Sequence, residues 1–542
     1  MRRIRDEKLE HDRRERVHEL RERRDRARAA ATTGRHRRAA RQAESGARWL
    51  DGRLPFLDAG KGLLRKIFPD HWSFLLGELA LYSFTLLLLT GVYLTFFFKP
   101  AMGETVYTGG YAPLRGVRMT EAYASTLAIS FDVRGGLLIR QMHHWAALVF
   151  VAAIGVHLLR VFFTGAYRRP REVNWLIGLT LFQLALVEGF AGYSLPDDLL
   201  SGTGLRTAQG FMLAVPLVGS YLAFFAFGSE WPGQDIVPRL YTTHVLLLPG
   251  LLLGLVTAHL ILVFYLKHTQ WGGPGRSGRN VVGQPFFPTF LAKTGGLAAM
   301  VFGLLALLAA VAQINPIWDY GPYRADQAST DAQPDWYMGF LEGALRLMPG
   351  TETRLWGHTV AWNPLLPAVV FPLVLFTALY AYPFVEQWIT GDRSEHHLCD
   401  RPRNRPTRTA LGVAGVTAYA VLLLAGAQDV LAYKFELSVD VLDWTLRVAL
   451  FVAPALAFRL TRYLCLALQS RDRDRVARGT PTGFVDQSPE GGFHQGHTPL
   501  TPARTYVLTL DRPPDAVAPA DTSRRERVRA ALGDWYYRDR VR

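Results

Sequence analysis

Five histidines lie inside long apolar runs of the chain, where an ionisable side chain is costly and normally functional. His143 and His157 are 14 residues apart in one run, and His244 and His259 are 15 apart in another. Fourteen helical residues complete almost four turns and rise about 21 Å, so the histidines of one run share a face at two depths. If both runs cross a membrane in the same direction, His143 matches His244 in depth and His157 matches His259. Two such pairs are what two bis-histidine haems require, although a histidine can also be a satisfied polar residue in a helical bundle.

The first apolar run begins with two adjacent histidines, His143 and His144, and only one of them is needed as a ligand. His144 is 13 residues from His157, which turns it about 100° away from the shared face. We therefore assign His143 as the ligand and expect His144 to pack or hydrogen-bond nearby. Arg140 and Arg160 lie three residues beyond the two ligands. They are candidates to pair with haem propionates, or they are ordinary interfacial arginines.

Glycines repeat at the histidine spacing in two further apolar runs. Gly77 and Gly91 are 14 residues apart, as are Gly178 and Gly192. A glycine lets a flat macrocycle approach a helix backbone, whereas the simpler explanation is close packing of small residues between membrane helices. Together with the histidines, the glycines favour two stacked porphyrin sites.

The elements that position these residues are predicted to be eight membrane-spanning helices. Apolar runs of sufficient length occur at about 74–98, 142–163, 174–193, 242–266, 295–314, 365–385, 409–427 and 444–466. A shorter stretch, 211–228, is interrupted by Pro216 and Gly219, and we interpret it as interfacial helix.

Basic residues cluster in alternate loops and in the N-terminal arm, so the net charge of +15 is unevenly distributed. The positive-inside rule places all of these clusters, and both termini, on the cytoplasmic side of the cell membrane. Residues 2–42 are rich in arginine and fit a solvated arm on an anionic lipid surface. We expect no nucleic-acid partner, because no recognition motif accompanies the charge.

Two features bear on electron donors and acceptors. The chain has two cysteines and no C-x-x-C pair, which excludes C-x-x-C-H haem attachment and a cysteine-held iron–sulfur cluster within it. The outward loop between the fifth and sixth spans contains PDWY at 334–337. Here Asp335 is a candidate to take a proton from a quinol hydroxyl, and Tyr337 to hydrogen-bond or to line the pocket.

These motifs in combination resemble the cytochrome b subunit of a bc1 complex. The resemblance rests on GYSLPDDLLSGTG (192–204), the two histidine spacings and PDWY, which stands where the family has Pro-Glu-Trp-Tyr. The segments IFPDHWSFLLGELALYSF, IRQMHHWAAL and QPDWYMGFLEGALR are similar to the actinobacterial form. The resemblance covers roughly residues 60–470.

The resemblance implies an all-α polytopic membrane protein of eight helices with a four-helix dihaem bundle and polar extensions. The expected division is a basic arm (1–60), the dihaem domain (61–270), a quinol-site domain (271–470) and a polar cytoplasmic tail (471–542). The expected activity is that of a quinol–cytochrome c oxidoreductase that translocates protons.

The family's roles carry over residue by residue. His143 and His244 would ligate an outer low-potential haem b, and His157 and His259 an inner high-potential haem b. Asp335, Trp336 and Tyr337 would line the outer quinol site, with Tyr193 and the PDD turn nearby. Menaquinol is the implied donor. The implied partners are a Rieske iron–sulfur subunit, a dihaem cytochrome c subunit and an aa3-type oxidase, in a complex expected to be a homodimer.

Two departures from the family pattern qualify these expectations. The 15-residue spacing, which is more like the b6 type, should rotate His259 relative to His244, and Asp335 is one methylene shorter than the family's glutamate. The inner quinone site is poorly marked, with Lys267 and His268 as the only candidates.

Three rival interpretations use the same residues differently. A dihaem anchor of a dehydrogenase would need neither the PDWY loop nor eight spans. A transporter with histidine proton relays would contain no haem. A photosynthetic b6 protein is disfavoured, because the two halves are fused in this chain.

Overall fold

A computed structural model describes residues 64–229, 231, 233–327, 333–510 and 523–537, with isolated positions 42, 45, 46, 49, 52 and 62. The basic arm predicted for 1–60 therefore lies almost wholly outside the described residues. The chain divides into two units, Met1–Ile67 with Gln284–Ala292 and Phe68–Gly283 with Lys293–Arg542. The first unit includes β5 (Gln284–Pro285) and the π-helical turn η4 (Phe286–Phe290). The second unit carries all the candidate site residues.

Eight helical segments within the described ranges are long and apolar enough to cross a membrane, which confirms the predicted number. They are Trp72–Thr95, Gly136–Phe163, Glu172–Tyr193, Ile236–Leu266, Phe286–Val311, Trp362–Thr390, Pro406–Gly426 and Val439–Arg478. The last segment extends well beyond the predicted 444–466, because its polar C-terminal turns continue the same helix. The stretch 211–228 is not a span: it contains the end of α7 (Leu199–Leu213), a break and α8 (Gly219–Phe227).

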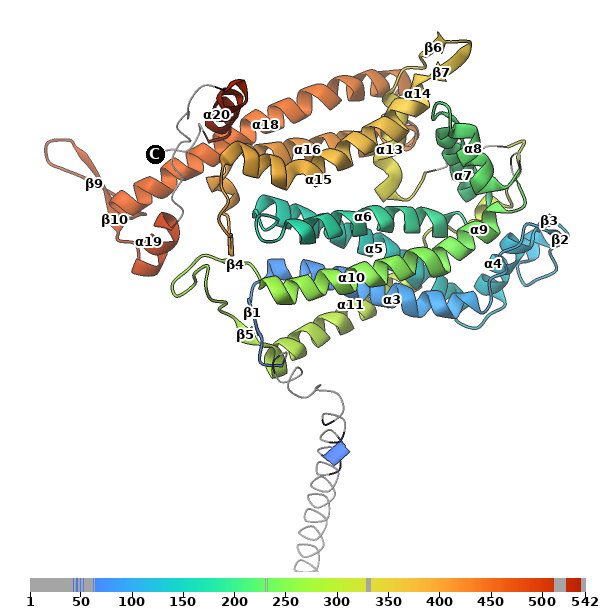
Figure 1. The fold of residues 1–542 in the computed structure, drawn as a ribbon, viewed down its shortest axis with the longest axis horizontal. Coiled ribbons are helices and arrows are strands. Elements are labelled where there is room, and N and C mark those ends of the chain that lie inside the picture. The colour runs from blue at the N-terminus through green and yellow to red at the C-terminus, as the bar shows by residue number, and fades with distance from the viewer. Residues whose placement is uncertain are drawn as a thin grey trace, which may run out of the picture. The chain divides into compact units, whose positions relative to one another are not determined.

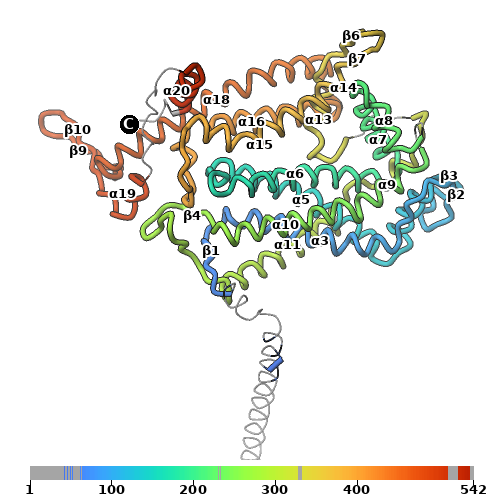
Figure 2. Tube along the Cα trace, in the orientation of Figure 1, coloured from blue at the N-terminus to red at the C-terminus, as the bar shows by residue number. Residues whose placement is uncertain are grey.

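Four of these segments form a bundle around the histidines. They contain α3 (Leu76–Thr95), α5 (Gly136–Phe163), α6 (Glu172–Tyr193) and α10 (Leu248–Leu266). Helix α3 packs along α5, and α10 packs along α6 (Figures 1 and 2). The core between them includes Phe84 and Phe150, whose rings stack with centroids 5.4 Å apart. Phe84 lies midway in sequence between Gly77 and Gly91, and Phe150 lies midway between His143 and His157. This aromatic layer therefore separates the two histidine depths.

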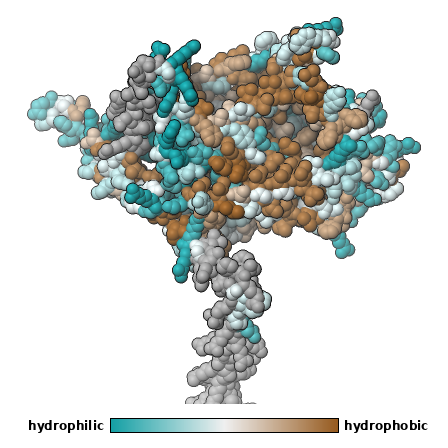
Figure 3. Space-filling view, in the orientation of Figure 1, coloured by the Kyte–Doolittle hydropathy of each residue, from teal (hydrophilic) through white to brown (hydrophobic). Residues whose placement is uncertain are grey.

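A second group of helices lies beside the bundle. It contains α13 (Gly339–Leu347), α15 (Phe371–Thr390), α16 (Pro406–Gly426) and α18 (Val439–Arg478). Helix α16 packs against both α13 and α18 (Figure 1). Hydrophobic side chains gather across the middle of the helices in Figure 3, and hydrophilic ones gather toward their ends. This pattern is the one expected of helices that cross a lipid bilayer.

Shorter elements connect the spans. The helical ones are α4 (Glu121–Phe131), α12 (Ile317–Tyr320) and α17 (Gln428–Phe435). Three spans contain further elements: α9 (Ile236–Thr242) and η3 (Thr243–Leu247) belong to the fourth, α11 (Leu291–Val311) to the fifth, and α14 (Trp362–Leu365) and η6 (Leu366–Val370) to the sixth. The strand pairs that lie between spans in the second unit are β2 (Glu104–Val106) with β3 (Arg118–Thr120), β4 (Gln270–Trp271) with β8 (Leu398–Cys399), and β6 (Glu352–Leu355) with β7 (His358–Ala361).

The predicted polar tail contains regular structure. After α18 come the hairpin β9 (Thr480–Gln487) and β10 (Phe493–Thr498), then α19 (Pro502–Thr509) and α20 (Arg524–Tyr537). Helix α20 packs against α15. The Tyr536 hydroxyl donates a hydrogen bond to the buried Glu386 carboxylate and lies 3.3 Å from the Tyr382 hydroxyl.

Candidate functional site

The four predicted ligand histidines form the two expected pairs. The ring centroids of His143 and His244 are 6.1 Å apart, and those of His157 and His259 are 6.4 Å apart. A metal ion bound to one nitrogen of each ring at about 2 Å would separate the centroids by roughly 6 Å. Both pairs therefore have the separation that a bridging metal ion requires.

The donor set of each pair fits a haem. No group of three or more His, Cys, Asp or Glu side chains suited to a metal ion occurs in the described part of the chain. Each pair thus offers two protein ligands, and the remaining ligands must come with the bound group, as a porphyrin provides them.

All four predicted glycines face the ligand histidines. A Cβ atom added at Gly77 would lie 3.2 Å from His157 Cε1, and one added at Gly91 would lie 3.3 Å from His143 Cε1. On α6, a Cβ at Gly178 would lie 3.8 Å from His259 Cε1. A Cβ at Gly192 would lie only 2.5 Å from His244 Cε1. The glycines leave the space beside each ring open, and Gly192 is the tightest of them.

The expected rotation of His259 relative to His244 is wrong. Both histidines face their partners on α5, and the interplanar angles of the two pairs are similar, at 77° and 72°. The reason is local: His244 lies in the π-helical turn η3. A π-bulge takes up one extra residue in an otherwise α-helical run, so 15 residues span the distance of 14.

Two residues that the sequence reasoning missed orient the first pair. Nδ1 of His143 lies 2.9 Å from the Thr90 hydroxyl, which itself donates to the Leu86 carbonyl. Nδ1 of His244 lies 3.1 Å from both the backbone carbonyl and a carboxylate oxygen of Glu188. These contacts occupy Nδ1 and leave Nε2 for a metal, as is usual for histidine ligands. A single threonine in an apolar helix is too common a feature to have revealed Thr90 as a partner of His143.

The two predicted arginines are half-buried next to the pairs, and part of each guanidinium is fully buried. Nε and Nη2 of Arg140 are buried and have no hydrogen-bond partner among the described residues, and the guanidinium stacks 5.7 Å from the Trp318 ring centroid. Arg160 stacks 4.3 Å from the Phe74 centroid and approaches Cys399 Sγ at 3.8 Å. A buried guanidinium with free donors is a site for an anionic group.

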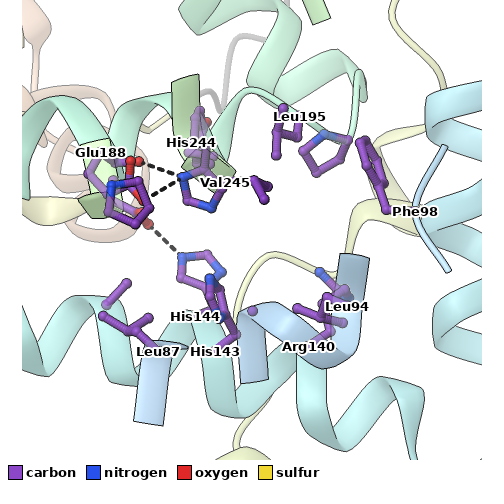
Figure 4. A pocket seen from close by; sticks show the side chains of 18 of the residues that line it. Leu87, Leu94, Phe98, Arg140, His143, His144, Glu188, Leu195, His244 and Val245 are labelled. Atoms are coloured by element: carbon purple, nitrogen blue, oxygen red, sulfur yellow. Dashed lines mark hydrogen bonds and ion pairs between the residues drawn. The ribbon is translucent and has the colours of Figure 1, made fainter. Parts of the chain in front are cut away.

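The PDWY loop meets the bundle beside the His143–His244 pair. A cavity of about 330 Å³ is lined by both histidines, by Asp335 and by Tyr337. Figure 4 shows His143 and His144 on one wall of this cavity and His244 with Glu188 on the opposite wall. Its other lining residues include the predicted Gly91, Gly192, Arg140 and Tyr193, and Asp198 of the PDD turn. One cavity thus joins the first histidine pair to the candidate proton acceptor.

Asp335 is held at both carboxylate oxygens. His144 Nε2 lies 3.0 Å from Oδ1, and the Tyr337 hydroxyl donates to Oδ2 at 3.0 Å. Burial raises the pKa of Tyr337 well above its usual value, and the nearby Asp335 raises it further. Tyr337 therefore stays a neutral phenol that donates a hydrogen bond at physiological pH.

A larger, apolar cavity of about 1350 Å³ lies next to the first one. It is lined by Trp336, Tyr337 and Phe340 together with residues of α5, α15, α16 and α18. Trp336 faces this cavity, while Tyr337 lines both. A prenylated ring compound would find its polar end at Asp335 and apolar walls beyond it.

The PDD turn (196–198) begins α7 at the edge of the first cavity, which Asp198 and Leu200 line. Asp198 accepts hydrogen bonds from the backbone N–H groups of Leu200 and Ser201 and so caps α7. Asp197 accepts a hydrogen bond from Thr120, and burial raises its pKa to about 7.

The two candidates for the inner quinone site, Lys267 and His268, lie at the C-terminal end of α10. Lys267 ends α10 with a φ of 65° and is exposed. Its carbonyl accepts a hydrogen bond from Arg171 at 3.0 Å. The His268 ring packs on Phe68, with centroids 4.6 Å apart.

Comparisons with known proteins agree with this geometry. A sequence profile described as "Cytochrome b(N-terminal)/b6/petB" matches residues 148–322. The chain is 54% identical to the "Cytochrome bc1 complex cytochrome b subunit" of Streptomyces coelicolor over 94% of this chain and 95% of that protein. It is 49% identical to the Mycobacterium leprae protein of the same description over 85% of this chain and 83% of that one. A solved structure described as "Hyperthermophilic respiratory Complex III" shares the fold, with a TM-score of 0.58 at 20% identity over 77% of this chain and 98% of that chain.

Proposed function

Because the chain belongs to the family of cytochrome b subunits of cytochrome bc1 complexes, we propose that it oxidises a quinol next to the His143–His244 pair. As a member of this family it is a haem-binding, multi-pass membrane protein of respiratory electron transport. The observation that carries the proposal is the cavity that His143 and His244 share with Asp335 and Tyr337.

Each histidine pair holds one haem b. The separations of the rings, the glycines beside them and the Nδ1 contacts of His143 and His244 support this assignment. Arg140 and Arg160 supply buried positive charge for the propionates. When bound, the haems supply one-electron carriers at two depths of the membrane.

The protein's own residues handle the quinol and its protons. Oxidation of one quinol to a quinone releases two electrons and two protons. Asp335 accepts one proton from a quinol hydroxyl, and Tyr337 keeps the carboxylate in place through its hydrogen bond. The apolar cavity beside Trp336 holds the ring and prenyl chain and excludes water.

The quinol site lies at the outer face, and the His157–His259 pair lies toward the cytoplasm, where both termini also lie. This orientation rests on the basic loops. One electron leaves to a Rieske iron–sulfur subunit and the other crosses to a quinone on the cytoplasmic side, so protons are released outside. Menaquinol is the proposed donor, and a dihaem cytochrome c subunit, an aa3-type oxidase and a second copy of the complex are the proposed partners.

Haem content and quinol turnover test the proposal together. A dithionite-reduced minus oxidised spectrum and a pyridine haemochrome assay should give two b haems per chain. His143→Ala should lose one haem and keep the other. Asp335→Asn should keep both haems and lose about 10²- to 10⁴-fold in quinol oxidation. A well-folded chain without haem, or an Asp335→Asn variant with normal turnover, would refute the proposal.

A further inference from the structure

We propose that His144 is a positioning residue of the quinol site: it fixes the Asp335 carboxylate toward the cavity. The inference rests on the function proposed above. Its basis is the contact of 3.0 Å between His144 Nε2 and Asp335 Oδ1, in which both side chains are largely buried, at 17% and 8% exposure.

The helix geometry explains why the histidine doublet serves two purposes. Consecutive residues of α5 point about 100° apart, so His143 faces His244 in η3 while His144 faces the PDWY loop. The contact joins positions 191 residues apart in the chain. One turn of α5 therefore carries both a haem-ligand candidate and the residue that holds the proton acceptor.

The same part of α5 is fastened to the segment that follows α11. Gln141 exchanges two hydrogen bonds with the backbone of Ile314, at 2.9 and 2.8 Å, and the Trp145 indole N–H donates to the Ala312 carbonyl at 2.8 Å. These bonds flank His144 on both sides in sequence. His144 therefore lies on a turn of α5 that is held in place by hydrogen bonds on both sides.

The short side chain of Asp335 makes this support necessary. Tyr337 alone would hold one carboxylate oxygen and leave the other free to rotate away from the cavity. With His144 on Oδ1 and Tyr337 on Oδ2, both oxygens are fixed, and each keeps a lone pair for a quinol hydroxyl. The fixed Asp335 carboxylate can then accept the proton of a quinol hydroxyl without the greater reach of a glutamate side chain.

The test uses the whole complex in membranes, with a menaquinol analogue as the electron donor. The variants are His144→Ala, His144→Gln, Asp335→Asn and the double variant of His144→Ala with Asp335→Asn. Glutamine keeps an N–H donor at a similar reach. The control is His494→Ala, on the exposed strand β10. The measurements are kcat, KM and b-haem content per chain.

We expect His144→Ala to lower kcat by about 10²-fold, because a misplacement of roughly 1 Å costs that much, with KM changed less than about threefold and full haem content. His144→Gln should recover most of the loss. The double variant should be no slower than Asp335→Asn, because His144 acts through that carboxylate. His494→Ala should behave as the wild type.

Failure of the inference differs from failure of the proposed function. Normal turnover in His144→Ala, together with slow turnover in Asp335→Asn, would overturn only the positioning role of His144. A double variant whose loss in kcat equals the product of the two single losses would also overturn only that role. Normal turnover in Asp335→Asn would instead overturn the proposed site. If His144→Ala loses haem, the test is repeated with His144→Asn, whose amide donor is too short to reach the Asp335 carboxylate. Normal turnover of the His144→Asn variant would then overturn the inference.

Discussion

The close approach between Gly192 and His244 gives the sharpest prediction about the histidine pairs. A Cβ atom at position 192 would lie 2.5 Å from Cε1, 2.9 Å from Nε2 and 3.0 Å from Nδ1 of the His244 ring. All three are shorter than a normal contact, and the ring is held by Glu188 and cannot rotate freely. Gly192→Ala should therefore push His244 away from His143.

The size of the effect follows from packing energies. Forcing one extra carbon into a filled site costs about 1–3 kcal/mol, which corresponds to roughly 5- to 150-fold weaker binding at that pair. Gly178→Ala is the matched control on the same helix, because its nearest atoms are 3.7 and 3.8 Å away, an ordinary contact. Gly77→Ala and Gly91→Ala should fall between them, with contacts of 3.2 and 3.3 Å.

The assay is the number of b haems per chain by pyridine haemochrome, with a redox titration to show which haem is lost. We expect Gly192→Ala to lose the haem of the His143–His244 pair first and Gly178→Ala to keep both. Equal haem loss in the two variants, or loss only in Gly178→Ala, would refute the reasoning that these glycines are needed for the space beside the rings.

Three further predictions concern other parts of the chain. Thr90→Val should weaken haem binding at His143 by about 10- to 100-fold, measured by haem retention during dilution; unchanged retention would contradict a role for the Nδ1 contact. Because burial raises the pKa of Asp197 to about 7, the folded protein keeps a proton that the unfolded chain loses above about pH 4, and stability falls as the pH rises toward 7. Asp197→Asn should therefore gain stability over the wild type by up to about 3 kcal/mol between pH 5 and pH 7.5 in thermal unfolding, and a pH-independent difference would exclude this origin. Tyr536→Phe removes a donor to the buried Glu386 and should cost about 1–3 kcal/mol of stability, whereas an equal effect of Trp535→Phe, at a more exposed position, would point to a general effect of α20.

The number of spans and the identity of the paired histidines were predictable from the sequence. Both depend on local regularities: the length of apolar helix that crosses a bilayer and the 3.6-residue turn that repeats a side chain's direction. The spacings of His143 with His157 and of Gly77 with Gly91 carry that information in single segments. The choice of His143 over His144 as the ligand follows from the same periodicity, because one residue of helix turns His144 about 100° away from the shared face.

Other features depended on contacts between distant segments. The π-helical turn at His244 restored the alignment that the 15-residue spacing would have broken, and reasoning from a regular helical period did not anticipate this turn. The contact of His144 with Asp335 and the docking of Tyr536 on Glu386 join segments 191 and 150 residues apart. The sequence by itself determined which residues share a helix face, because that follows from helix periodicity. Only the tertiary structure decided what each face meets, because this depends on how all the helices pack together.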